Sequence, residues 1–313
     1  MLGFVLKRLA LAVPTLLAVV TVVFFVIRVV PGDPAIAMLG DSATDSALTA
    51  LRERMGLNEP LLLQYLNFLA GLVQGDLGLS IRTGQPVLDQ ILRVLPYTLD
   101  LTIASVLIGV LFGIPAGLLA AVKRNRWADY ITRMVSLLGL SFPVFFLAIL
   151  LILLFSIQLG WFPVISEGDL GDPIDRLHHL FLPALAGSLG VAAFVTRATR
   201  SSVLESLGED FVRTARAKGL PRHVVLLRHA FRNALIPVVT VIGLYLGLVI
   251  GNSVLIEIVF NRPGLGKLIV ESLTQRDYAM LQGLIITYSF FIVLANLITD
   301  LTYGLMDPRV KHQ

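Results

Sequence analysis

The chain has 313 residues, of which 56% are hydrophobic and only 15% are charged, and its formal net charge is +4. A soluble domain has about 45 to 50% apolar and about 25% charged residues, so this composition excludes an ordinary soluble protein and predicts an integral membrane protein. The absence of cysteine excludes a disulfide framework and a thiolate metal site. A spanning protein needs an excess of basic residues on its cytoplasmic loops, and we expect no nucleic-acid partner.

A membrane-spanning helix needs roughly 20 apolar residues, and six stretches of the chain reach or approach that length. The first follows Lys7 and Arg8, but its apolar run is too long for a signal peptide and no small-residue cleavage site follows it. We therefore predict an all-α integral membrane protein with six transmembrane helices. The predicted spans are 9–30, 98–122, 134–159, 181–196, 234–260 and 281–306.

The distribution of lysine and arginine predicts the orientation of these spans, because basic residues accumulate on the cytoplasmic side. Most of them lie in the N-terminus, in 123–133, in 197–233 and in the C-terminal tail. The alternate loops, 31–97, 160–180 and 261–280, carry fewer basic residues and many acidic ones. We expect the first set, and with it both termini, to face the cytoplasm.

This topology divides the chain into three parts. Residues 1–97 comprise the first transmembrane helix and an external cap segment, in which apolar residues from Leu61 to Leu72 recur at helical spacing. The cap has two candidate uses, contact with a partner or shielding of the helix ends. Residues 98–306 form the main transmembrane domain of five helices, and 307–313 form a cytoplasmic tail.

The loop 197–233 contains an unusual basic segment that continues into the fifth span, RTARAKGLPRHVVLLRHAFRNALIP, residues 213–237. Apolar residues recur at three- and four-residue steps from Leu204 to Ala215, and again from Val224 to Leu235. Gly219 suits the residue just past a helix end, and Pro221 suits the first turn of the next helix. The pattern predicts helix, sharp turn, helix.

Three uses compete for this element. A basic amphipathic hairpin could contact anionic lipid headgroups. Its basic residues could instead reflect only the general excess of positive charge on cytoplasmic loops. The third use is insertion into a cytoplasmic partner. The tight corner favours the third, because a segment that floats on the membrane surface needs no such turn.

RTARAKG followed by HAFRNALIP resembles the cytoplasmic loop of bacterial ABC importer permeases. Arg213 and Thr214 depart from the general E-A-A triplet of that family, but RTARAKGL with HxxRNAxxPVVT is typical of its peptide and nickel branch. The resemblance extends over nearly the whole chain. It includes MLGFVLKRL at the start, VVPGDP (29–34), GDLGLS (75–80), NRPGLGKL (261–268), RDY (276–278) and DLTYGLMDPRV (300–310).

The resemblance implies a type I permease fold in which the loop is a coupling helix, seated in a cleft of an ATPase subunit. Motion of that helix would enter the fifth span through Asn233 and Pro237. The residues implied in contact with the ATPase are Arg213, Thr214, Ala215, Arg216, Ala217, Lys218 and Gly219.

The same resemblance implies half of a translocation pathway for short peptides, dipeptides or oligopeptides, with nickel and glutathione as alternatives. The implied partners are a second homologous permease that completes a heterodimer, two cytoplasmic ATPase subunits and an external solute-binding protein. The complex would lie among the lipids of a prokaryotic cytoplasmic (inner) membrane. ATP and Mg would be bound by the ATPases, with no cofactor in this chain.

The sequence PGLGK (263–267) superficially resembles a phosphate loop. A Walker A motif reads G-x-x-x-x-G-K-[ST], whereas here Asn261 and Leu268 occupy the first and last positions. The topology also places it outside the cell. His178 and His179 lie in an acidic loop without further ligand spacing. We expect no catalytic residue, no ATPase site and no metal site, so the chain is not itself an enzyme.

Glycines recur at four-residue steps in two spans and predict close helix packing. They are Gly109, Gly113 and Gly117 in the second span, and Gly243, Gly247 and Gly251 in the fifth. The fifth span also carries polar residues that we expect to line part of the pathway. These are Tyr245, Asn252 and Ser253.

Ionisable residues within spans are functional candidates. We expect Arg28, Asp100 and Glu257 to lie near the outer surface, where they pair with one another or extend their charged groups toward the membrane surface. We expect Asp300 to pair with a basic residue such as Arg197 or Arg200. The rival hypothesis is a self-contained secondary carrier that uses Asp100, Glu257 or Asp300 for proton coupling, but the inverted-repeat halves typical of such carriers are not evident. A third hypothesis, an enzyme within 31–97, lacks a histidine there and a nucleophile with a base.

Overall fold

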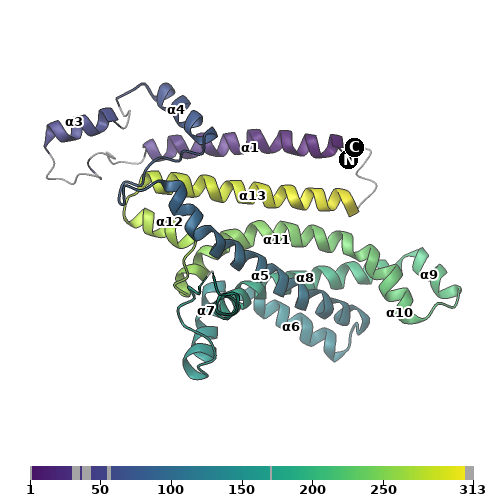
Figure 1. Cartoon of the computed structure of the whole chain (residues 1–313). Coiled ribbons are helices and arrows are strands. Elements are labelled where there is room, and N and C mark those ends of the chain that lie inside the picture. Colours follow the sequence, from purple (N-terminus) through teal and green to yellow (C-terminus); the bar gives the residue numbers. More distant parts are fainter. Residues whose placement is uncertain (1, 30–35, 37–43, 55–57, 170, 307–313) are drawn as a thin grey trace.

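The computed structural model describes residues 2–29, 36, 44–54, 58–169 and 171–306. Apart from an isolated β-bridge between Leu79 and Pro86, the regular elements in these ranges are helices, which confirms the predicted all-α fold. The long helices lie roughly side by side (Figure 1). They are α1 (Leu2–Val29), α5 (Val87–Val122), α8 (Pro173–Gly208), α11 (Arg232–Val259) and α13 (Tyr278–Met306).

Shorter helices lie at the two ends of this bundle. One end carries α9 (Asp210–Ala217) and α10 (Arg222–Val224), together with the start of α1 and the end of α13 (Figure 1). We call this the hairpin end. The opposite, far end carries α4 (Leu61–Val73) and α12 (Leu265–Thr274). The described part of the cap segment also contains α3 (Asp45–Arg54). Residues 30–34 of VVPGDP, and the tail 307–313, lie outside the described residues.

Among the residues that the structure describes, five helical segments are long and apolar enough to cross a membrane, and a bent pair supplies a sixth crossing if it is counted as one span. The pair consists of α6 (Trp127–Ser141) and α7 (Val144–Leu151) with the π-helical segment η1 (Ile152–Gln158), and it bends by 104°. The predicted span 134–159 is therefore divided between two helices that meet at Phe142 and Pro143. Phe142 adopts an extended conformation (φ −89°, ψ 135°), as the residue before a proline prefers.

The fourth span is much longer than the predicted 181–196. Helix α8 begins at Pro173, where the Asp172 side chain accepts hydrogen bonds from the amides of Ile174 (2.9 Å) and Asp175 (3.3 Å), an N-cap followed by proline. At 1.5 Å per residue its 36 residues extend about 54 Å, beyond a hydrocarbon core of about 30 Å. The prediction from apolar runs therefore covered only the middle of α8 and left out its polar ends.

Helices α5 and α8 form the centre of the bundle, and α11 packs against both. Glycines permit the approach of α5 to α8: a Cβ on Gly109 would lie 2.6 Å from the Val191 side chain, and one on Gly113 2.8 Å from Val195. Gly117 faces the α8 backbone in the same way. Small residues that allow backbones to approach are a general device of membrane helices. Helix α1 lies at the edge, on α13.

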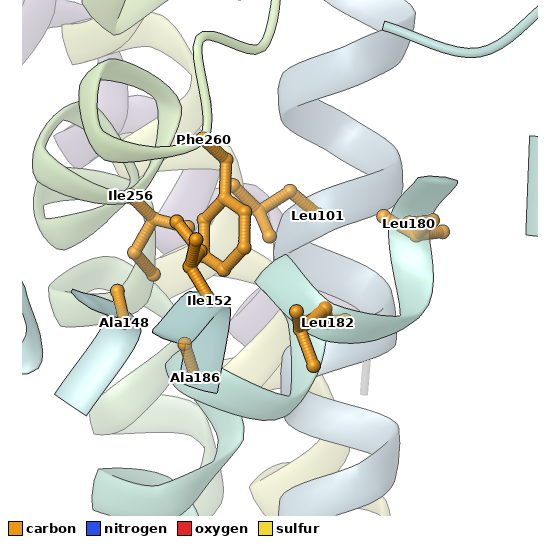
Figure 2. Close-up of a cluster of buried hydrophobic side chains, with 9 residues drawn as sticks. Leu101, Ala148, Ile152, Leu180, Leu182, Ala186, Ile256 and Phe260 are labelled. Carbon is orange, nitrogen blue, oxygen red and sulfur yellow. The ribbon is translucent and has the colours of Figure 1, made fainter. Parts of the chain in front are cut away.

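An apolar cluster closes the core toward the far end. Leu101 of α5, Ile256 of α11 and Phe260 just after it are almost fully buried. Figure 2 shows these side chains converging with residues of α7, η1 and α8. This cluster fixes the bent pair against α8 and α11.

Glu257, which is fully buried near the end of α11, holds the start of α12. Its carboxylate accepts hydrogen bonds from the amides of Gly266 (2.8 Å) and Lys267 (3.0 Å) and from the Thr98 hydroxyl (2.7 Å). A Cβ on Gly264 would collide with this carboxylate. The NRPGLGKL motif therefore wraps a buried carboxylate at a helix N-terminus, where negative charge is stabilised.

Asp277 holds the start of α13 in the same way as Glu257 holds the start of α12. Its carboxylate accepts hydrogen bonds from the amides of Met280 (3.1 Å) and Ile81 (3.1 Å) and from the Ser80 hydroxyl (2.5 Å). The RDY and GDLGLS motifs therefore contact each other, and this contact joins the segment before α5 to the start of α13.

Mutual pairing of Arg28, Asp100 and Glu257, one of the two roles expected for them, was wrong. Asp100 pairs with Arg176 of α8 (Nη2–Oδ1 2.5 Å), and Arg28 of α1 donates to Gln64 of α4. The buried Arg262 donates to the Ser166 carbonyl (2.8 Å) and lies 3.9 Å from Asp100. Burial lowers the pKa of the Arg262 guanidinium, and Asp100 opposes this shift. These groups are bound by neighbours from several parts of the chain, which sequence spacing does not reveal.

Candidate functional site

The hairpin end is formed by the chain between α8 and α11. Helix α8 ends at Gly208, Glu209 is extended (φ −70°, ψ 152°), and α9 follows. The predicted continuous helical face from Leu204 to Ala215 was therefore wrong, because the helix breaks between them. After the turn, α10 leads through the π-helical segment η2 (Val225–Phe231) directly into α11.

The turn after α9 has the geometry that its glycine predicted. Gly219 has φ +75°, a region that favours glycine. Its amide donates to the Arg216 carbonyl (3.0 Å), and the Leu220 amide donates to the Ala215 carbonyl (3.4 Å). This pair of bonds is a Schellman motif. Pro221 then occupies the N-cap of α10, one residue before its predicted place in the first turn.

Helix α9 is attached to the rest of the chain through small apolar side chains. Val212 and Ala215 are buried against Val225 and Ala230 of η2, with Leu207 of α8 beside them. Beyond η2, helical backbone runs without a gap from Arg222 to Val259. A displacement of α9 would therefore act on α11 through this contact and this continuous helix.

The residues that the resemblance assigns to ATPase contact divide into two groups. Ala215 is buried under α9, so its side chain is unavailable to a partner. The others lie on the exposed surface, and the ion pair between Arg213 and Asp210 (3.3 Å) is itself exposed, where such pairs contribute little stability. Asn233 and Pro237 are also exposed, in the first turns of α11. The exposed residues are Arg213, Thr214, Arg216, Ala217, Lys218 and Gly219.

A groove of about 650 Å³ lies at the base of this hairpin. The ends of α5 and α8 form one wall with Ala121, Val122 and Leu207, and the hairpin forms the other. The hairpin wall brings together Arg216, Leu220, Arg222, His223, Val225 and Leu226. The site therefore offers a mixed basic and apolar surface to a macromolecular partner.

A second hollow, of about 350 Å³, lies beside the bend between α6 and α7. Tyr245 and Asn252 of α11 line it, facing Pro143 and the glycines Gly187 and Gly190 of α8. Ser253 does not: its hydroxyl is buried and lies 3.3 Å from that of Tyr288 in α13. Asn252 is exposed on a spanning helix, where contact with lipid is unfavourable, so this face suits water, cargo or another subunit.

The fifth-span glycines have three different environments. A Cβ on Gly243 would collide with Thr299 of α13. At Gly247 it would make ordinary contacts of 3.9 Å. At Gly251 it would have no described atom within 4 Å. Only Gly243 is thus held in close helix contact in this structure.

Asp300 pairs with a basic residue, as expected, but its partner is neither of the two arginines named as examples, Arg197 and Arg200. Asp300 pairs with Arg8 of α1 (2.8 Å). Arg200 instead binds the buried Asp129 of α6 through two hydrogen bonds (2.6 and 2.8 Å). Asp129 is the sole acidic residue in 123–133, and this is the signal that could have identified it as a partner.

No cluster of three His, Asp or Glu side chains with the arrangement of a metal site occurs in the described ranges. The His178 ring lies 2.9 Å from the Trp161 carbonyl, and the His179 ring 3.0 Å from that of Asp175. In PGLGK, the backbone amides of Gly266 and Lys267 donate hydrogen bonds to the Glu257 carboxylate. These two amides are therefore not available to a phosphate group.

Comparison with known proteins gives a consistent result. Residues 113–312 match the family described as "Binding-protein-dependent transport system inner membrane component". Residues 1–102 match "Binding-prot-dependent transport system membrane comp, N-term".

The chain is 42% identical to "Glutathione transport system permease protein GsiC" of Escherichia coli (strain K12) over 313 residues, 100% of both chains. The protein of the same name from Shigella dysenteriae serotype 1 (strain Sd197) gives the same identity and coverage. The MetNI methionine ABC transporter in inward-facing conformations is similar in fold. The TM-score is 0.59 at 19% identity, over 69% of this chain and 96% of that chain.

Proposed function

The chain belongs to the binding-protein-dependent transport system inner membrane component family, and from this premise we propose that it forms half of an import pathway for short peptides, with glutathione as the first cargo to test. It is a multi-pass permease subunit of an ABC importer in the bacterial inner membrane. The ATPase activity of such an importer belongs to partner subunits, so the chain is not an enzyme.

The observation that carries the proposal is the continuity between the hairpin and α11. Helix α9 presents exposed basic residues at one end of the bundle, and it rests on η2, whose backbone continues to Val259. ATPase subunits that close on ATP need a stiff element through which to move the spans. The hairpin, with residues 213–219 as contact surface and Asn233 and Pro237 at the entry to α11, is such an element.

The assembly follows from this assignment. A family of binding-protein-dependent importers implies an ATPase, a solute-binding protein and a second permease. We propose two ATPase subunits at the hairpin end, in the cytoplasm, since the basic loops gather there. The second permease would be a homologous chain in a heterodimer, and the receptor would dock at the far end.

The cargo assignment rests on the full-length identity with permeases named for glutathione. Glutathione is a tripeptide, so this cargo also agrees with the resemblance to peptide permeases. Three carboxylates that a proton-coupled carrier would use are already engaged: Asp100 by Arg176, Asp300 by Arg8, and Glu257 by the start of α12. This engagement disfavours the rival carrier.

Reconstitution tests the proposal. Liposomes containing the permease pair would be prepared with and without the ATPase subunits, with receptor and labelled glutathione outside and ATP inside. We expect uptake only with the ATPases and ATP, and none from an imposed proton or sodium gradient. Gradient-driven accumulation by this chain alone would contradict the proposal.

A further inference from the structure

Two hollows lie in line along the seam between α6 and α8. The first is the hollow beside the α6–α7 bend, lined by Gly139 of α6 and Gly190 of α8. The second, of about 330 Å³, lies nearer the hairpin end. Residues three, four or seven apart share a helix face, so Gly139 lies on the face of α6 that carries Thr132 and Ser136, and Gly190 lies on the face of α8 that carries Arg197. The second is lined by Thr132, Arg133, Ser136, Leu137, Thr196, Arg197 and Arg200.

An aromatic pair lies between the two hollows. Phe194 is one turn beyond Gly190 and one turn before Arg197 on α8, and its ring centroid lies 4.2 Å from that of Tyr245 on α11. The Arg197 guanidinium lies over the Phe194 ring, 5.7 Å from its centroid. A solute that moves from the first hollow to the second would pass this pair and then meet Arg197.

The second hollow carries an excess of positive charge, because its three arginines have the carboxylate of Asp129 beside them and Asp129 acts on Arg133 as well as on Arg200. Arg200 is neutralised by the buried Asp129, with Nε 2.6 Å from Oδ1. Arg133 and Arg197 are exposed, and neither forms an ion pair with a carboxylate in the described part of the chain. Guanidinium groups bind carboxylates through two parallel hydrogen bonds.

We propose that Arg133 and Arg197 are specificity-determining residues that receive the C-terminal carboxylate of anionic cargo on its way to the cytoplasm, just past the constriction formed by Phe194 and Tyr245. This inference rests on the proposed function and names the chemical class of its cargo. An unmodified short peptide carries a C-terminal carboxylate. In glutathione this is the glycyl carboxylate, and the γ-glutamyl residue carries a second one. A free divalent cation would be repelled by the same two arginines.

The test compares two cargoes in one complete importer. Liposomes with the permease pair, ATPases and receptor would take up labelled glutathione or its glycyl monoethyl ester, which lacks one carboxylate. The variants are Arg133→Gln with Arg197→Gln, Arg197→Lys, and the control Arg124→Gln, an exposed arginine outside the hollow. Because the receptor is the same throughout, its own preference cancels when the glutathione-to-ester uptake ratio is compared between variants.

We expect the double variant to lower this ratio roughly tenfold, which corresponds to about 1.4 kcal/mol. Arg197→Lys should retain most of the preference, and Arg124→Gln should match the wild type. Equal losses for both cargoes, or no loss, would overturn the inference. So would a defect that disappears in vesicles of phosphatidylcholine without anionic lipid, because the hollow would then bind lipid headgroups. Failure of the proposed function itself is distinguishable, since the wild type would then show no ATP-driven uptake of either cargo.

Discussion

Two charged side chains at the far end of the bundle are buried and bound from several sides, whereas those on the surface of the hairpin are exposed. Glu257 and Arg262 have 0% exposure, while the side chains of Arg213 and Asp210 are 75% and 93% exposed. The far end is joined by hydrogen bonds between segments distant in sequence. The hairpin is attached by a small apolar cluster and a glycine turn.

This difference assigns a mechanical role to each end. A buried carboxylate that binds several backbone amides is costly to disturb, so the far end holds α5, α11, α12 and α13 in fixed relation. Exposed charges at the hairpin end contribute little to folding and remain available to a partner. Substitutions should therefore reduce stability at the far end and coupling at the hairpin end.

The largest loss of stability is expected from Glu257→Ala. It would leave the amides of Gly266 and Lys267 and the hydroxyl of Thr98 buried without this acceptor, at about 1–3 kcal/mol for each lost partner. We expect about 3–5 kcal/mol in all, measured by unfolding in detergent. Glu271→Ala is the matched control, because Glu271 is exposed on α12, the helix whose start Glu257 holds, and makes only a 3.8 Å ion pair with Lys267. Equal effects of the two substitutions would contradict the assigned role of Glu257.

The α5–α8 contact should be next in size. A valine at Gly113 would meet Val195 and the Ala192 carbonyl, both within 3.0 Å of the new Cβ. We expect a loss of about 3 kcal/mol from overpacking. Gly251→Val, at a glycine of α11 with open surroundings, should be neutral. A comparable loss at both sites would show that the spacing of glycines, rather than their contacts, determines stability.

A smaller loss is expected from Asp277→Ala, which removes the N-cap of α13 and its contact with Ser80 and Ile81. Loss of a helix cap costs about 1 kcal/mol of unfolding free energy. Loss of the hydrogen bonds from Ser80 and Ile81 adds to this cost, for about 2 kcal/mol in all. Asp89→Ala, an exposed aspartate in the first turn of α5, should change stability by less than about 0.5 kcal/mol. Thermal unfolding with both variants side by side measures the difference.

The features predicted correctly from the sequence are those determined by local chemistry. Apolar runs located the crossings, and Gly219 followed closely by Pro221 predicted the turn, because each depends on neighbours in the chain. The assignment of residues 213–219 to ATPase contact rests on the family resemblance and remains a prediction.

The errors concern features that depend on which helix faces meet. Asp129 and Arg200 are 71 positions apart, and nothing in their local sequence pairs them. Asn252 and Ser253 are adjacent, yet one lines a hollow and the other is buried against α13. The polar ends of α8 were not predicted, because the helix continues beyond the apolar run of residues from which the span was predicted.

The most direct test of whether the hairpin transmits ATP-driven motion to α11 compares two glycines that have similar backbone conformations but lie in different parts of the molecule. Gly219 (φ +75°) and Gly84 (φ +67°) both have positive φ, and at neither would a Cβ have a described atom within 4 Å. Valine at either site should therefore cost a similar amount of stability, about 1–2 kcal/mol. Only Gly219 lies in the hairpin.

The measurement is glutathione taken up per ATP hydrolysed by the reconstituted importer. We predict that Gly219→Val lowers this ratio severalfold while ATP hydrolysis continues, and that Gly84→Val leaves it at the wild-type value. An unchanged ratio in Gly219→Val would contradict the account that ATP-driven motion enters the permease through this turn.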